Sequence, residues 1–289
     1  CLIILSFFQI SNPFFQLIIL IRHGESEGNC DKSVNRYVPN HKVVLTQRGH
    51  QQAKDAGLKL ESMLNEDDSV LFYTSPYKRT RQTLDGLISG ISNSGIPYKV
   101  HEEPRMREQD FGNFQSTAEE MEMIWKERAH YGHFFYRIPY GESAADVYDR
   151  CAGFNETLFR QFQSDKFPSV LVLVTHGIWA RVFLMKWYRW TYEEFESLKN
   201  VGHCQFLVME KNPETERYKF LTKLAKWDDD DEEDEKEYRE EMKDEVLKNS
   251  NSYTDMNFSS SDLSKESQRS QREKERKLKE LFKKTLDKC

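Results

Sequence analysis

An apolar pentapeptide that runs directly into a charged octapeptide constrains the fold of this chain most strongly. Residues 17–21 are all leucine or isoleucine, and residues 22–29 begin with Arg22 and His23 and contain two glycines. A short run rich in β-branched residues and ended by a charge and a glycine is typical of a buried parallel strand. Open α/β sheets bind their ligands just past the carboxyl ends of such strands. The arginine and the histidine therefore predict an anion site at that edge of the sheet.

The composition limits how much of the chain can pack and what it can bind. The 289 residues allow one sizeable core and one appendage, but 38% hydrophobic and 31% charged residues are too polar for a chain packed throughout. The net charge of −6 gives no case for nucleic-acid binding. Five cysteines lie far apart without a CxxC pair, which argues against a disulfide framework or a zinc site and favours a reducing, cytoplasmic location. They are Cys1, Cys30, Cys151, Cys204 and Cys289.

Two segments differ in composition from the globular body, which we place at residues 17–227. Residues 1–16 open on Cys rather than Met and form an interrupted apolar stretch, so we expect a non-native or disordered segment, with a membrane anchor as the alternative. Residues 228–289 begin with unbroken acid and have too few apolar residues to pack alone, so we expect a disordered, solvated tail. The alternative is that its basic end, residues 274–288, forms a helix that contacts a protein or an anionic membrane surface.

Further strands and helices alternate along the body. Apolar runs predict strands at residues 70–73, 98–101 and 170–174, and two closing edge strands at residues 205–209 and 218–221. Thr46 can cap a helix between the first two strands. An apolar helix follows the strand at residues 170–174.

Serines mark the starts of two other helices. Ser75 is a natural N-cap and Pro76 a natural first helical residue, which would place Arg79 in the first turn, where the helix N-terminus and a cation can act on the same anion. Ser143 predicts the cap of a long helix that ends near residue 163.

Two strand–loop–helix units present a histidine followed by a glycine. His23 follows the first strand and His176 follows the strand at residues 170–174, while Arg79 and Glu108 also come just past strands or turns. These positions share one edge of a parallel sheet, so together with Arg22 they predict a phosphoryl-transfer site. One imidazole would attack phosphorus, the arginines would hold phosphate oxygens, the second imidazole would add positive charge, and a protonated carboxyl would release the leaving oxygen.

Other candidate features carry less chemistry. No residue cluster has metal-ligand spacing, no phosphate-binding glycine loop occurs, and Ser26 lacks the pattern of a nucleophile elbow. Residues 116–140, rich in aromatics and charge, predict a helical excursion that walls the site, with plain packing as the alternative. We interpret the remaining histidines as structural or exposed: His41, His50, His101, His130, His133 and His203.

The order and spacing of these motifs resemble the histidine phosphatase superfamily, the phosphoglycerate mutase-like proteins. The resemblance covers about residues 17–227. It begins with Arg22-His23-Gly24-Glu25-Ser26-Glu27-Gly28-Asn29 and continues through Leu45-Thr46 with Gly49, Thr74-Ser75 with Arg79, Glu108, Gly141-Glu142-Ser143 and Thr175-His176-Gly177.

The resemblance implies a fold and a set of roles. The fold would be an α/β domain, a three-layer α/β/α sandwich with a mostly parallel central sheet. His23 would be the phosphorylated nucleophile and Glu108 the proton donor. Substrate contacts would come from a pocket of Arg22, Ser26, Asn29, Arg79 and His176. No metal or organic cofactor is implied.

Within the superfamily, the match through Gly28 and Asn29 and at residues 110–112 is most similar to fungal broad-range acid phosphatases and plant mutase-like proteins. Glu25 stands where glycolytic mutases usually carry glutamine. The resemblance therefore implies a phosphomonoesterase acting on a small phosphorylated substrate. Mutase-type phosphoryl transfer and a non-enzymatic phospho-ligand-binding protein are the alternatives, although a binding protein would not need the acid Glu108. The physiological substrate and the oligomeric state stay open.

Overall fold

A six-stranded sheet lies at the centre of the part of the chain that the structure describes. The structure, a computed structural model, describes residues 16–113, 115–164 and 166–227. The predicted N-terminal segment, except Gln16, and the predicted tail at residues 228–289 lie outside the described residues. The strands are β1 (Leu17–Arg22), β2 (Val70–Thr74), β3 (Tyr98–Glu102), β4 (Val170–Thr175), β5 (Phe206–Lys211) and β6 (Tyr218–Phe220).

The strand order is β3-β2-β4-β1-β5-β6, and the four strands β1 to β4 are parallel to one another. β5 pairs antiparallel with β1, and β6 pairs antiparallel with β5. The prediction of a mostly parallel sheet is thus confirmed. One part of it was wrong, because β5 lies inside the sheet and the edges are β6 and β3. The buried Phe206, Leu207 and Met209 explain the inner place of β5, whereas every residue of β3 is exposed.

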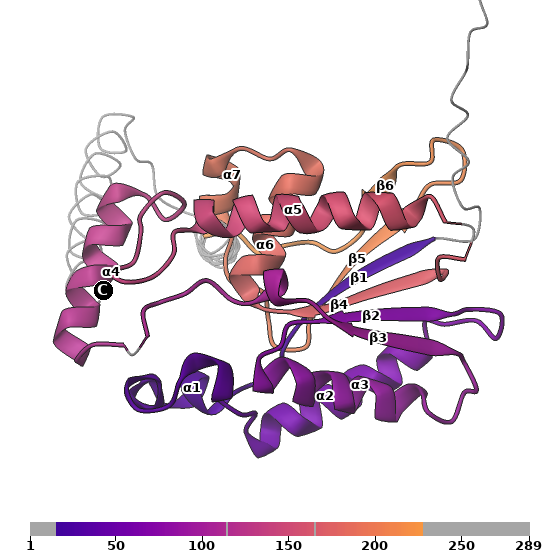
Figure 1. The fold of residues 1–289 in the computed structure, drawn as a ribbon, viewed down its shortest axis with the longest axis horizontal. Coiled ribbons are helices and arrows are strands. Elements are labelled where there is room, and N and C mark those ends of the chain that lie inside the picture. Colours follow the sequence, from indigo (N-terminus) through magenta and orange to yellow (C-terminus); the bar gives the residue numbers. More distant parts are fainter. Residues whose placement is uncertain (1–15, 114, 165, 228–289) are drawn as a thin grey trace, which may run out of the picture. The chain divides into compact units, whose positions relative to one another are not determined.

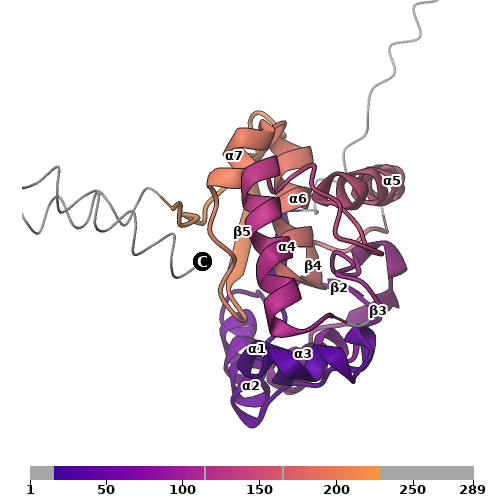
Figure 2. The same ribbon diagram turned by 90° about the vertical axis from the view of Figure 1, so that its left-hand side faces the viewer.

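Helices cover both faces of this sheet, as the α/β/α prediction requires (Figures 1 and 2). α2 (Gln47–Glu61) and α3 (Lys78–Ile91) lie on one face, and α5 (Ala144–Phe162) and α6 (Gly177–Tyr188) lie on the other. α4 (Ala118–Tyr131) confirms the predicted helical excursion. The short elements are α1 (Glu27–Cys30), α7 (Tyr192–Ser197) and three 3₁₀ turns, η1 (Lys32–Arg36), η2 (Asn40–Lys42) and η3 (Pro104–Met106).

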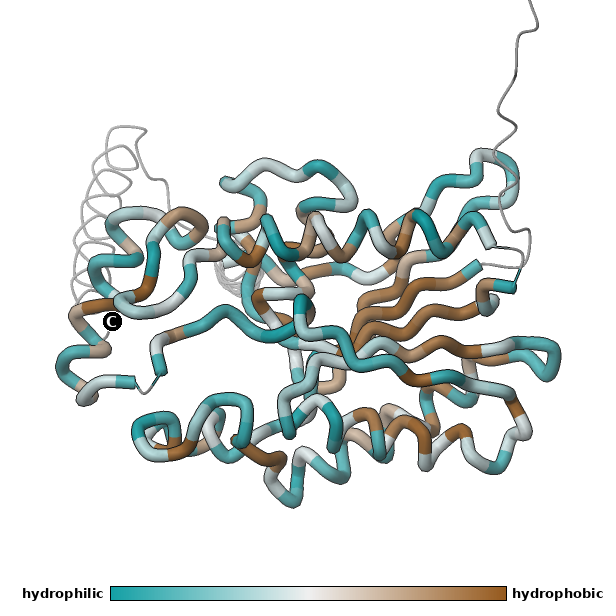
Figure 3. Tube along the Cα trace, in the orientation of Figure 1, coloured by the Kyte–Doolittle hydropathy of each residue, from teal (hydrophilic) through white to brown (hydrophobic). Residues whose placement is uncertain are grey.

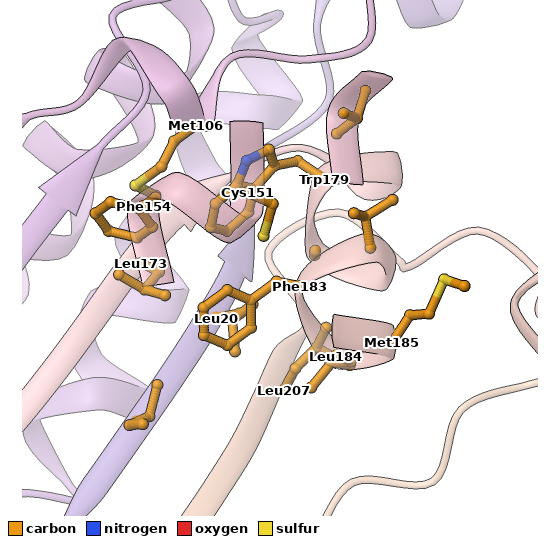
Figure 4. Close-up of a cluster of buried hydrophobic side chains, with 14 of the residues drawn as sticks. Leu20, Met106, Cys151, Phe154, Leu173, Trp179, Phe183, Leu184, Met185 and Leu207 are labelled. Atoms are coloured by element: carbon orange, nitrogen blue, oxygen red, sulfur yellow. The ribbon is translucent and has the colours of Figure 1, made fainter. Parts of the chain in front are cut away.

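The central strands are apolar because both of their faces are covered (Figure 3). Along β1, Ile18 and Leu20 pack in the cluster beneath α5 and α6, while Ile19 and Ile21 pack in the cluster beneath α2 and α3. All four side chains are fully buried. Figure 4 shows the first of these clusters, in which Trp179 of α6 lies among side chains of α5 and the sheet. Burial of this kind contributes about 1.5–3 kcal/mol for each large apolar side chain.

The N-cap residues predicted from the sequence are confirmed for two helices and wrong for a third. The side chains of Thr46 and Ser143 cap α2 and α5 as predicted. The prediction that Ser75 caps α3 was wrong, because α3 begins at Lys78 with Tyr77 as its N-cap residue. The reason is a competing partner, since the Ser75 hydroxyl forms a hydrogen bond with the ring of a histidine that lies just past β4. Within the described ranges, no helix combines the length and the apolar character that crossing a membrane requires.

Candidate active site

His23 and His176 meet at one edge of the sheet because β1 and β4 are neighbouring parallel strands. Arg22 pairs in register with Thr175, so each histidine follows its strand at the same level. The ring centroids are 5.2 Å apart, and both side chains are buried. The backbone at residue 24 lies so close to α2 that only glycine fits there. A Cβ on Gly24 would lie 2.5 Å from a backbone oxygen of α2. The sheet topology therefore brings the two predicted histidines together.

Hydrogen bonds to both ring nitrogens assign the tautomer of His23. Nδ1 lies 2.7 Å from the Gly24 carbonyl oxygen, which can only accept, so Nδ1 carries the proton. The Arg79 Nε–H donates to Nε2 at 3.1 Å, which identifies Nε2 as the nitrogen with the free electron pair. Burial lowers the pKa of His23 well below its ordinary value, and the charges of Arg79 and Arg22 lower it further. The ring is thus neutral in the pH range where an ordinary histidine becomes protonated.

Arg79 lies in the first turn of α3, as predicted, and is buried. Its Nη1 donates to the carbonyl oxygen and to the side-chain Oδ1 of Asn40, at 2.7 and 2.9 Å, and its guanidinium lies over the Tyr77 ring. Burial lowers the pKa of Arg79 to about 10, so the group remains a cation at neutral pH. These partners hold a fixed positive charge directly beside His23.

His176 contacts Ser75 and Tyr77, two residues that precede α3. Its Nε2 is 2.8 Å from the Ser75 hydroxyl, while its buried Nδ1 has no hydrogen-bond partner among the described residues. Burial, followed by the charges of Arg79 and His23, lowers the pKa of His176 well below its ordinary value. The ring is therefore neutral here, and the positive charge predicted for it would require a bound anion to raise its pKa.

Arg22 ends β1 and directly precedes His23. One Nη donates to the carbonyl oxygen of Val201, and the buried Nε has no partner among the described residues. Burial lowers the pKa of Arg22, and the Glu108 carboxylate partly opposes that shift. An unpaired buried N–H is unfavourable, so Arg22 offers a donor that a phosphate oxygen would satisfy.

Glu108 lies among arginines and is half-buried. Four arginines have pKa values that burial lowers and that the Glu108 carboxylate partly raises again; they are Arg22, Arg79, Arg128 and Arg181. The charge of the Glu108 carboxylate therefore acts on all four guanidiniums. Its predicted role as the proton donor stays a prediction.

An arginine–glutamate pair holds the loop that carries Glu108. Nη1 of Arg150 donates to the carbonyl oxygens of Arg105 and Arg107, at 2.7 and 2.8 Å, and its Nη2 donates to that of Glu108 at 3.1 Å. The Glu142 carboxylate accepts from Arg150 Nε and Nη2 at 3.1 and 3.0 Å, and from Arg107 Nη2 at 2.6 Å. Glu142 belongs to the Gly-Glu-Ser motif, so this motif fixes the acid loop as well as capping α5.

Ser26 and Asn29 lie within one turn and bond to each other. The Oδ1 of Asn29 accepts from the Ser26 amide at 3.0 Å and from the Ser26 hydroxyl at 2.8 Å. Ser26 is buried and Asn29 is exposed. Their bonds are to each other rather than to the His23 ring, so their predicted part in substrate binding stays a prediction.

Sequence reasoning missed several residues of the site. Ser75 was interpreted as a cap, and Asn40 stands in a polar stretch that carried no motif. His203 was interpreted as structural or exposed, yet its Nδ1 lies 3.2 Å from the His23 carbonyl oxygen and its ring is 5.9 Å from that of His23. His203 precedes β5, and the antiparallel pairing of that strand with β1 brings it to the site. Only the strand order could have found it.

The donors gathered here suit an anion rather than a metal ion. Among residues 16–113, 115–164 and 166–227, no group of three or more His, Cys, Asp or Glu side chains is arranged to hold a metal. Guanidinium and imidazole N–H groups instead converge around His23, and such groups bind phosphate oxygens.

Comparison with known proteins agrees with this geometry. The model of the histidine phosphatase superfamily (branch 1) matches residues 18–224. The chain belongs to this superfamily.

Two relatives are similar to this chain over two thirds or more of its length. The broad-range acid phosphatase DET1 of Saccharomyces cerevisiae is 40% identical, over 76% of this chain and 93% of the yeast protein. The phosphoglycerate mutase-like protein AT74H of Arabidopsis thaliana is 47% identical, over 67% of this chain and 73% of its own length. The predicted resemblance to fungal acid phosphatases and plant mutase-like proteins is confirmed.

Solved structures share the fold. A mycobacterial glucosyl-3-phosphoglycerate phosphatase, solved with VO₃, has a TM-score of 0.56 at 20% identity and matches 73% of this chain and 98% of its own. A protein described as mycobacterial hydrolase 1 has a TM-score of 0.58 at 20% identity, over 73% and 99% of the two chains. The predicted α/β class is thus confirmed.

Proposed function

We propose that this protein is a phosphomonoesterase that hydrolyses phosphate esters in two displacements on His23. The observation that carries the proposal is the state of the His23 ring. Its Nδ1 proton is committed to the Gly24 carbonyl, and its Nε2 electron pair faces a buried guanidinium. A neutral imidazole aimed at a cationic pocket is what attack on a phosphate ester requires.

In the first displacement, the Nε2 electron pair of His23 forms a bond to phosphorus while the bond from phosphorus to the ester oxygen breaks. The carboxylic acid of Glu108 gives its proton to that oxygen, and an alcohol leaves. Arg22 and Arg79 hold the non-bridging oxygens, on which negative charge is concentrated. His176, neutral beforehand, donates a hydrogen bond or gains a proton when the phosphoryl group arrives.

In the second displacement, water attacks the phosphohistidine. The Glu108 carboxylate, left by the first step, accepts a proton from that water. The bond from phosphorus to Nε2 breaks, and its electron pair returns to His23 as inorganic phosphate leaves. Glu108 is then an acid again, so the two steps close a cycle without a metal or cofactor.

Family membership and the acid phosphatase relative support hydrolysis. The test is to mix the enzyme with a ³²P-labelled phosphate ester, stop the reaction with base, and look for a labelled phosphoenzyme. A phosphohistidine is labile to acid and stable to base. We expect labelling of the wild type and none in His23→Asn. The matched control is His50→Asn, which removes an exposed histidine of α2. Labelling of His23→Asn equal to that of the wild type would refute the nucleophile.

Two alternatives give different results in companion assays. A mutase supplied with 3-phosphoglycerate and 2,3-bisphosphoglycerate isomerises faster than it releases phosphate, and that outcome would replace hydrolysis as the main activity. A phospho-ligand-binding protein binds esters without turning any of them over. The presence of Glu108 among the arginines supports turnover, because binding alone needs no group to protonate the leaving oxygen.

A further inference from the structure

The proposed reaction gives no role to Ser75, although this serine is fully buried beside one of the two histidines. Ser75 directly follows β2, and its Oγ lies 2.8 Å from Nε2 of His176. The two side chains meet because β2 and β4 are neighbouring parallel strands and His176 follows β4. A hydroxyl can donate or accept, so the direction of this hydrogen bond decides which ring nitrogen of His176 carries the proton.

The other partner of the Ser75 hydroxyl indicates that the hydroxyl donates to the ring. Among the described residues, that partner is the Tyr77 amide, whose N–H lies 3.4 Å from Oγ and can only donate. Oγ therefore accepts the Tyr77 N–H, and the hydroxyl proton is left with Nε2 of His176 as its acceptor. In this arrangement the hydroxyl accepts once and donates once, and Nδ1 of His176 carries the ring proton.

The opposite direction would leave more buried groups unpaired. If Nε2–H donated to Ser75, the hydroxyl proton would have no acceptor within the described ranges, and the buried Nδ1 of His176 would be an acceptor without a donor. With Ser75 as the donor, the Nδ1–H group alone lacks a partner there. Buried polar groups without a partner are unfavourable, so the arrangement with one such group is favoured over the arrangement with two.

The start of α6 supports the same tautomer. His176 is the N-cap residue of this helix, a position where a side-chain acceptor ordinarily takes an N–H of the first turn. The His176 side chain makes no such bond, as expected if Nδ1 is protonated and cannot accept. Nδ1 is thus a buried donor on a ring whose centroid lies 5.2 Å from that of His23. Burial keeps the pKa of His176 well below its ordinary value, so the ring is neutral.

We propose that Ser75 is a positioning residue that fixes His176 as its Nδ1–H tautomer, so that the neutral ring donates this proton in a hydrogen bond to an oxygen of the phosphoryl group. The inference rests on the proposed function only in taking the bound anion to be the phosphoryl group of a substrate. His23 and His176 then share one tautomer but present opposite ends. His23 offers the electron pair of Nε2, and His176 offers the proton of Nδ1.

The first test observes the tautomer directly by NMR. Two-bond ¹⁵N–¹H correlations of the ¹⁵N-labelled full chain at neutral pH distinguish the two neutral tautomers from the imidazolium. The His176 signals are those absent from His176→Asn, and if that variant fails to fold, the contact with the Tyr77 ring, 5.1 Å away, identifies them. We expect Nδ1 alone to be protonated, both in the free chain and with saturating inorganic phosphate. An Nε2–H tautomer in the free chain, or an imidazolium with phosphate, would overturn the inference.

The second test removes the Ser75 hydroxyl. In Ser75→Ala we expect His176 to populate the Nε2–H tautomer, and calorimetry should show inorganic phosphate binding about tenfold more weakly, because a donor to an anion is lost. Ser75→Thr keeps a hydroxyl and should restore the tautomer and part of the affinity. An unchanged tautomer in Ser75→Ala would overturn the role of Ser75, whatever the affinity. Should Ser75→Ala fail to fold, Ser75→Cys, whose thiol is a weak donor, takes its place.

Thr74→Val is the matched control. Thr74 is also buried, and its hydroxyl donates to the Ser75 carbonyl oxygen at 3.1 Å rather than to a ring. Valine has nearly the same shape, so we expect the wild-type tautomer of His176 and a change in phosphate affinity of less than twofold. If Thr74→Val shifts the tautomer and weakens binding as Ser75→Ala does, general loosening of this segment explains both variants, and the inference fails.

Turnover separates this inference from the proposed function. Absence of any phosphoenzyme or hydrolysis in the wild type, with the tautomer and the phosphate affinities as expected, would refute the proposed function alone. Hydrolysis by a wild type whose His176 carries its proton on Nε2 would overturn the inference and leave the proposed function intact.

Discussion

The two sides of the site are built in different ways. The phosphate side, made of Arg22, His23, Arg79 and His176, stands on strand ends and the first turn of a helix, and both histidines are buried. The leaving-group side, formed by the loop that carries Glu108, is held by hydrogen bonds from Arg150, and α4 stands outside the two helix layers (Figures 1 and 2). A cavity of about 290 Å³ lies between that loop and α4, lined by Phe111, Met121 and Ile138 among others.

This difference in construction suggests that one side of the site governs the reaction and the other governs the choice of substrate. Neighbouring parallel strands in register fix the positions of His23 and its partners, so the phosphate side can vary little without loss of the fold. A helix that packs over a cavity has more freedom to change its residues and their reach. We expect the phosphate side to decide whether the reaction occurs, and the leaving-group side to decide on which esters.

The largest effect should come from removing the acid. In Glu108→Gln we expect kcat for glycerol 3-phosphate to fall about 10³-fold, because an alkoxide is a poor leaving group without a proton donor. With 4-nitrophenyl phosphate the phosphoenzyme should still form, since nitrophenolate leaves without a proton. Rapid mixing should then show a burst of one nitrophenolate per enzyme followed by slow turnover.

The burst distinguishes the roles of the two sides. If Glu108→Gln slows phosphoenzyme formation equally for both esters, Glu108 acts on the phosphoryl group rather than on the leaving oxygen. The division between a phosphate side and a leaving-group side would then break down.

Burial of two neutral histidines predicts a pH-dependent stability that originates in the phosphate side. The pKa values of His23 and His176 lie below their ordinary value of about 6.5 in the folded chain, so the unfolded chain binds more protons below that pH. Their contribution is complete above pH 6.5 and is lost as the pH falls toward the folded pKa values. Uptake of two protons on unfolding lowers the free energy of unfolding by at most about 2.7 kcal/mol for each pH unit.

Urea unfolding between pH 7 and pH 5 measures this slope. The double variant His23→Asn and His176→Asn should lose less free energy of unfolding over that range than the wild type, and His23→Asn alone should recover about half of the difference. Identical slopes in all three proteins would mean that the buried rings do not titrate on unfolding.

A smaller effect should follow from loosening the loop that holds the acid. Arg150→Met removes the donors to three carbonyls of that loop, including that of Glu108. We expect kcat for glycerol 3-phosphate to fall about tenfold, with less than a twofold change in the nitrophenolate burst, because only proton delivery loses its geometry. Arg150→Lys should restore part of the rate.

The pattern of the losses decides the role of Arg150. If the burst and the alkyl ester turnover decline together, the arginine stabilises the whole site and does not position the acid. Thermal unfolding of each variant separates this case from simple loss of folded protein.

The sequence predicted the phosphate side well for a physical reason. Apolar runs mark buried strands, and parallel strands bring the residues at their carboxyl ends to one edge of the sheet. His23, His176 and Arg79 could therefore be brought together from local patterns. The same patterns could not give the strand order. For this reason β5 was expected at the edge, and His203, which β5 carries to the site, was missed.

The leaving-group side was harder because its contacts are long-range and specific. Arg128 and Arg181 look like ordinary charges of helices, and only the structure shows that their Nε atoms are buried. Ser75 was misread for a related reason. A serine before Pro favours a cap locally, but the ring of His176, 101 positions away, takes its hydroxyl.

The smallest effect concerns Glu25, which stands where the resemblance implies glutamine for a glycolytic mutase. Its carboxylate accepts the Thr46 hydroxyl at 2.9 Å and pairs with the exposed Arg48 at 3.4 Å, so it faces the start of α2. An ion pair whose arginine lies in solvent contributes little to stability. Since Gln can accept the same hydroxyl, Glu25→Gln should change the ratio of isomerisation to phosphate release from 3-phosphoglycerate less than twofold. A larger change would show that residues behind the phosphate side also select the reaction.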